Sequence, residues 1–104
     1  MMNIKIMTEE EKNIVVRVED DIRVMQCVLW DNELLYDEQD FELDRATEAL
    51  LYGAYHDDIG YIMQGLDILK TVFQDIEGLE TEDYNFFNGC VSALEKVVDR
   101  HIKR

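Results

Sequence analysis

Proline is absent from this 104-residue chain, serine occurs once and glycine five times. Without prolines, and without a glycine- or serine-rich stretch, the chain has no segment typical of a linker between domains. It also contains no internal repeat. A chain of this length has room for one hydrophobic core. We therefore expect a single domain over residues 1–104.

Long apolar runs are missing as well. No run approaches the roughly 20 residues that a membrane-spanning helix needs, and residues 1–7 lack the features of a signal peptide. Cys27 and Cys90 lie in apolar contexts without a cysteine or histidine nearby in the sequence. Two buried thiols are the expected state, rather than a disulfide or a metal site. These features predict a cytoplasmic protein that does not bind membranes.

Basic residues are scarce. The chain has 10 lysines and arginines against 24 aspartates and glutamates, which gives a net charge of −14. Residues 1–30 contribute six acids and four bases (−2), residues 31–83 sixteen acids and two bases (−14), and residues 84–104 two acids and four bases (+2). The middle segment therefore carries the whole net charge. Direct binding to nucleic acid or to an anionic membrane is not expected, because both attract cations.

The first third of the chain is rich in β-branched residues, which favour strands. The sequence predicts strands over residues 3–7, 14–18, 22–30 and 33–36. Residues 8–12 are polar and predict a loop. A helix is the alternative for residues 22–30, because Ile22, Met25 and Leu29 also fit helical spacing.

From residue 41 onward the apolar residues recur at helical spacing, with Asp44 as a candidate N-cap. The clearest helical stripe consists of Ile59, Ile62, Leu66, Leu69, Phe73 and Ile76. Gly78 is expected to end that helix and Thr81 to cap the last one. Gly53 and Gly60 mark either a break between two helices or weak points within one.

Strands followed by helices predict an α+β fold. In this fold a small antiparallel sheet of three or four strands, in residues 1–36, packs against two or three helices in residues 41–104. A mostly helical domain is the alternative.

Motifs for catalysis are missing, so we expect neither an enzyme nor a cofactor. Ser92 lies in a predicted helix without a glycine-rich elbow, and no phosphate-binding loop is present. The two cysteines and two histidines are too far apart in sequence to indicate zinc.

Seven acids between Asp31 and Asp44 leave a divalent-metal site as one alternative. Counted as a calcium loop from Asp31, positions three and twelve are Glu33 and Glu42. Position five is Leu35, where a ligand is needed, and position six is Tyr36, where glycine is needed. A solvated acidic segment fits these residues better.

The excess of acids predicts a surface for a basic protein partner. Closely spaced carboxylates can replace phosphates against the lysines and arginines of a nucleic-acid-binding protein. Tyrosines add apolar contact area with a polar tip. The predicted contact residues are Asp31, Glu33, Tyr36, Asp37, Glu38, Asp40, Glu42, Asp44, Tyr52, Tyr55, Asp57, Asp58, Glu77, Glu80, Glu82 and Asp83.

In size, charge and lack of a catalytic motif, the chain resembles the small acidic inhibitors that phages and mobile elements carry against restriction and CRISPR nucleases. The resemblance implies a DNA-mimicking inhibitor and transfers no functional residue. Two other interpretations stay open. One is an antitoxin-like or adaptor module that binds a basic protein and that could form a homodimer through the exposed side of the last helix. The other is an acidic surface that only keeps the protein in solution.

Overall fold

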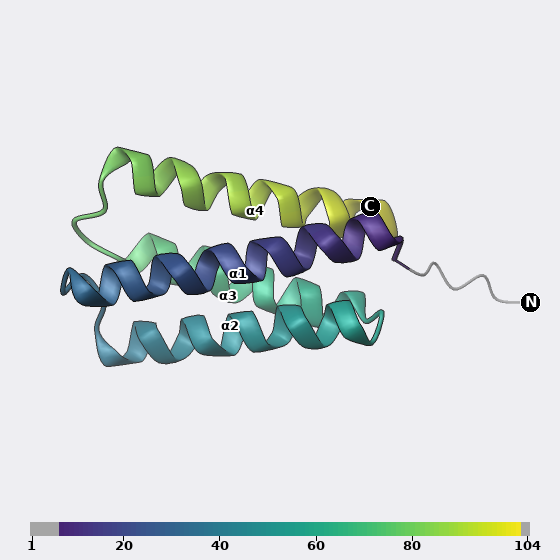
Figure 1. The fold of residues 1–104 in the computed structure, drawn as a ribbon, viewed down its shortest axis with the longest axis horizontal. Coiled ribbons are helices and arrows are strands. Elements are labelled where there is room, and N and C mark those ends of the chain that lie inside the picture. Colours follow the sequence, from purple (N-terminus) through teal and green to yellow (C-terminus); the bar gives the residue numbers. More distant parts are fainter. Residues whose placement is uncertain (1–6, 103–104) are drawn as a thin grey trace, which may run out of the picture.

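The N-terminal third of the protein is a long helix rather than a set of strands. The computed structural model describes residues 7–102. Within them the chain forms four helices and no strand: α1 (Glu9–Asp31), α2 (Asp37–Tyr55), α3 (Ile59–Asp75) and α4 (Thr81–His101). Successive helices run in opposite directions and form an up-down-up-down bundle (Figure 1). The predicted α+β fold with an N-terminal sheet is wrong, and the helical alternative describes the architecture.

The start of α1 lies in the segment that was predicted to be a loop. Thr8 is the N-cap, and its Oγ1 accepts a hydrogen bond from the Glu11 backbone N–H (3.1 Å). The Thr8 backbone N–H donates in return to Glu11 Oε1 (2.8 Å). This reciprocal pair is a capping box, which satisfies backbone groups that a helix start otherwise leaves unpaired. The polar residues 8–12 therefore begin a helix.

Burial along α1 explains why the strand prediction failed. The fully buried side chains follow helical steps and include Val15, Ile22 and Leu29. Val24 and Val28, which face the same side of a strand as Ile22, are exposed. The β-branched residues favour strands locally, but packing of one helical face overrides that preference. Of the strand predicted over residues 3–7, only Met7 is among the described residues.

The later helices occur where they were predicted, with shifted ends. α2 begins at Asp37 with Tyr36 as its N-cap, so the prediction that Asp44 is the cap is wrong. Residues 56–58 connect α2 to α3 and are not helical. Gly53 and Gly60 therefore mark a break between two helices rather than weak points within one. The N-cap of α4 is Glu80, one residue before the predicted Thr81.

The hydrophobic core runs along the bundle, and α2 and α3 approach each other closely within it. A Cβ atom placed on Gly65 of α3 would lie 2.9 Å from Leu50 Cδ2 and 3.0 Å from the Ala46 carbonyl oxygen. Both distances are shorter than ordinary van der Waals contact. The close approach of these helices therefore depends on the missing side chain at Gly65.

A pair of glycine substitutions tests this packing. We expect Gly65→Ala to lower the free energy of unfolding by about 1–3 kcal/mol, because the added methyl group overfills the core. Gly89→Ala on α4 is the matched control, since a Cβ there meets no atom within 4 Å. It should raise the free energy of unfolding by up to about 1 kcal/mol through higher helix propensity. Chemical denaturation measures both values, and equal effects of the two substitutions would contradict the predicted packing.

Candidate functional site

The turns between α1 and α2 and between α3 and α4 lie at the same end of the bundle, as Figure 1 shows. Gly78, which has a φ of +82°, lies against Leu34: a Cβ placed on it would be 3.3 Å from Leu34 Cδ2. The side chain of Gln39 also donates a hydrogen bond to the Asp75 carbonyl oxygen (3.0 Å). These contacts join the two turns into one surface. The turn between α2 and α3 lies at the other end.

Acidic side chains gather on this surface from the ends of all four helices. They are Asp31, Glu33, Asp37, Glu38, Asp75, Glu77, Glu80, Glu82 and Asp83, and we call this set the acidic end. Eight are exposed, and Asp83 is half-buried. Residues 31–44 and 71–94 contain no lysine or arginine. Within the described residues, none of the nine carboxylates forms an ion pair.

Four large aromatic side chains are exposed in the helical turns next to these acids. They are Trp30 (45% exposed), Tyr36 (74%), Phe41 (61%) and Tyr84 (53%). Of these, only Tyr36 is among the contact residues predicted from the sequence. No sequence signal marks the other three, because an exposed aromatic residue has the same spacing as a buried one until its neighbours are known. Aromatic residues are enriched at protein interfaces.

Three predicted contact residues lie on α2 behind the acidic end. Glu42 is ion-paired with Arg45 on its own helix (2.9 Å). The side chain of Gln26 on α1 donates hydrogen bonds to Asp40 Oδ1 (2.8 Å) and Asp44 Oδ1 (2.9 Å). Asp40 and Asp44 therefore flank the contact between α1 and α2, and the charge of Glu42 is paired within α2, so none of the three is counted in the acidic end.

The remaining predicted residues lie at the opposite end. Asp57 is ion-paired with Lys12 of α1 (3.2 Å), and Asp58 caps α3 through its side chain. Tyr52 and Tyr55 are exposed there, and Tyr52 stacks on His56 with ring centroids 4.1 Å apart. The structure therefore separates this group from the acidic end.

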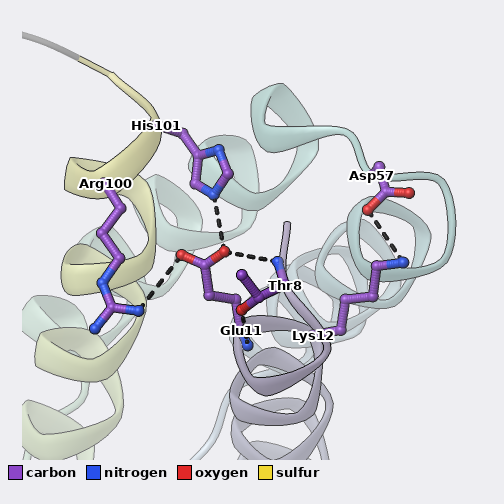
Figure 2. Close-up of polar contacts among 6 residues, drawn as sticks. All are labelled: Thr8, Glu11, Lys12, Asp57, Arg100 and His101. Atoms are coloured by element: carbon purple, nitrogen blue, oxygen red, sulfur yellow. Dashed lines mark hydrogen bonds and ion pairs between the residues drawn. The ribbon is translucent and has the colours of Figure 1, made fainter. Parts of the chain in front are cut away.

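The opposite end also pairs its charges internally, as Figure 2 shows for Glu11. This side chain is only 3% exposed. Its Oε1 lies 3.1 Å from His101 Nε2 and its Oε2 lies 3.6 Å from Arg100 Nη1, so it joins the start of α1 to the end of α4. Burial raises the pKa of Glu11, but the hydrogen bonds from Thr8 and His101 outweigh it and hold that pKa below its usual range.

A second buried glutamate on α1 has the opposite shift. Burial raises the pKa of Glu19, and the attraction of Arg23, whose Nε lies 3.2 Å from Glu19 Oε2, does not offset it. Within residues 7–102, that oxygen is buried and accepts no hydrogen bond. The charged form is therefore stabilised by the fold at Glu11 and destabilised by it at Glu19.

These shifts predict opposite effects of two matched substitutions. A lowered folded-state pKa gives stability above the unfolded-state pKa, near 4.5 for glutamate, and that stability is lost as the pH falls. A raised pKa gives stability that is lost as the pH rises. At pH 7 we expect Glu11→Gln to lower the free energy of unfolding by roughly 1–3 kcal/mol, and Glu19→Gln to raise it slightly.

Thermal unfolding followed by circular dichroism at pH 7 and at about pH 3 checks both changes. At the lower pH the difference between Glu11→Gln and the parent protein should shrink. If both variants lose the same stability at pH 7, the assignment of the two shifts is wrong.

Among residues 7–102, no three histidine, cysteine, aspartate or glutamate side chains are placed to hold a metal ion. The acids of residues 31–44 therefore form no metal cluster.

Cys90 is buried, and burial raises the pKa of its thiol to about 11. Cys27 is exposed, so the prediction that both thiols are buried is wrong for Cys27.

Comparisons with protein-family models, curated proteins and solved structures found no match to this chain. Its function must therefore be argued from the acidic end and the surfaces around it.

Proposed function

We propose that this protein binds a basic, nucleic-acid-binding protein through its acidic end. In this proposal it is a DNA-mimicking inhibitor of the kind that phages and mobile elements carry against restriction and CRISPR nucleases. The observation that carries the proposal is the set of nine exposed or half-exposed carboxylates without an ion pair within the described residues.

The positions of some of these acids weaken the fold, which supports a role in binding. A helix C-terminus carries partial negative charge and favours lysine or arginine in its last turn. Asp31 ends α1 and Asp75 ends α3, and neither helix has a basic residue in its last turn. Of the two helices that end at the opposite end, α4 does have Arg100 and His101 in its last turn and α2 has no basic residue there. Residues that break a local stability rule without compensation are typical of functional surfaces.

The chemistry of the acidic end suits a partner that binds DNA. Duplex DNA presents one negative charge per about 1.7 Å of helix axis to the cationic side chains that bind it. Nine carboxylates collected from four helix ends offer those side chains a group of negative charges in place of phosphates. The exposed Tyr36 and Tyr84 add apolar contact area between the acids. Opposite fields would also make association fast and sensitive to salt.

The proposal includes a reducing compartment such as the cytoplasm. Both cysteines are free thiols, and Cys27 is exposed to oxidation in an oxidising environment. Among residues 7–102, no helix is apolar over a length that would cross a bilayer.

Charge reversal with a matched control tests the proposal. The test variant is Asp37→Lys with Glu38→Lys, in the first turn of α2 at the acidic end. The control is Glu9→Lys with Glu10→Lys, in the first turn of α1 at the opposite end. Both variants change the net charge equally, replace exposed acids and remove favourable charges from a helix N-terminus. They differ only in which end of the bundle they alter.

A partner is captured from lysate at about 50 mM salt and its affinity is then measured for each variant. We expect at least a roughly tenfold loss for the test variant and a change within about twofold for the control. A short DNA duplex should displace the protein from its partner. Equal losses for both variants would show that only net charge matters, and simultaneous binding of duplex and protein would exclude mimicry.

A further inference from the structure

A groove on the outer side of the α1–α2 pair opens next to the acidic end. It has a volume of about 450 Å³, and its apolar lining comes from Val24, Cys27 and Trp30 of α1, all of which are exposed. Carboxylates lie along it: Asp31 at the end of α1, and Asp40 and Asp44 on α2. An exposed apolar strip with an acidic border is thus built into the side of the bundle.

The carboxylates from α2 are held in place from within the bundle. Gln26 is 8% exposed, and its Nε2 donates to Asp40 Oδ1 (2.8 Å), Asp44 Oδ1 (2.9 Å) and the Asp40 carbonyl oxygen (3.2 Å). One buried amide therefore fixes both side chains at positions one helical turn apart. Among the described residues, no hydrogen bond or ion pair engages the second oxygen of either carboxylate, so a ligand could donate to it.

The single basic residue in the lining is already paired along its own helix. Arg23 Nε lies 3.2 Å from Glu19 Oε2, and Arg23 Nη2 lies 3.8 Å from Asp20 Oδ1. Arg23 therefore does not neutralise Asp40 or Asp44. The groove keeps an excess of negative charge beside its apolar strip.

We propose that this groove binds a basic amphipathic helix of the partner protein. A groove between two antiparallel helices accepts a third helix along its length, and the apolar strip requires an apolar face on it. Asp40 and Asp44 are spaced to meet lysines or arginines three or four positions apart on one side of that helix. Trp30 offers an aromatic face to a cation or an apolar side chain. This inference rests on the proposed function and adds the binding mode of the partner.

Trp30 is the only tryptophan of the chain, so its fluorescence reports directly on the groove. The probe is a synthetic, tryptophan-free peptide of about 16 residues, with leucines on one helical face and lysines and arginines beside them. The control peptide has the same composition in scrambled order and thus the same charge without an apolar face. We expect the amphipathic peptide to bind at least about tenfold more tightly and to shift the Trp30 emission to shorter wavelength.

Variants then locate the binding site by calorimetry. Trp30→Ala should weaken binding of the amphipathic peptide at least about fivefold. Phe86→Ala, which removes a partly exposed aromatic ring (38% exposed) from α4 outside the groove lining, should change it by less than about twofold. Equal affinity for the two peptides, an unshifted emission, or unchanged binding by Trp30→Ala would each overturn the inference.

These outcomes are separable from failure of the proposed function. If Trp30→Ala has no effect while the reversal at Asp37 and Glu38 still abolishes capture of the partner, the acidic end alone binds it. If the peptide binds the groove but no captured partner depends on the acidic end, the proposed function is wrong. The groove would still bind basic amphipathic helices.

Discussion

Helix direction determines where charge can gather in this protein. In an antiparallel four-helix bundle, each end combines the N-termini of two helices with the C-termini of the other two. At the acidic end the N-termini belong to α2 and α4, whose first turns carry Asp37, Glu38, Glu82 and Asp83. The positive ends of these helices stabilise the acids beside them. The same topology leaves Asp31 and Asp75 at negative helix ends, so the acidic end is only partly compensated by the backbone.

The two ends of the bundle are consequently held together in different ways. At the opposite end, Glu11 contacts His101 and Arg100, and Lys12 pairs with Asp57, so ionic contacts connect segments far apart in sequence. The described contacts between the two turns of the acidic end are apolar or neutral, such as the Gln39 hydrogen bond to Asp75. Repulsion among its carboxylates is therefore opposed by the core beneath them and by the N-termini of α2 and α4 rather than by ion pairs. A cationic partner would remove that repulsion without requiring the bundle to rearrange.

The sequence predicted the helices of the second half well, because stripes such as Ile62, Leu66 and Leu69 have one dominant period. It failed for α1, where β-branched residues occupy both the buried and the exposed faces. Only the packing of Val15, Ile22 and Leu29 into the bundle selects the helix. The start of α1 was nevertheless detectable, since Thr8 and Glu11 have the spacing of a capping box.

The same error limited the prediction of the site. The predicted contact residues included the acids around residue 37, those around residue 80, and Asp57 and Asp58, without any order in space. Four helices with short connections place the first and third turns together and the second turn apart. Because residues 8–36 were predicted to form loops and strands, the alternation of turns in a four-helix bundle could not be applied to this chain. The exposure of Trp30 and Phe41 depends on side-chain packing, so it could not be predicted from the spacing of residues in the sequence.

The acidic end and the groove would contribute to binding in different ways. Exposed carboxylates act over about 10 Å at moderate salt, which raises the rate of encounter with a basic surface but adds little to the lifetime of a complex. Burial of an apolar strip containing Trp30 acts only after contact and lowers the rate of dissociation. Asp40 and Asp44, fixed by Gln26, lie beside this strip and would set the position of the cations on the proposed partner helix. A highly charged protein would gain specificity from this division, because a partner with charge but no apolar face would be attracted and then released.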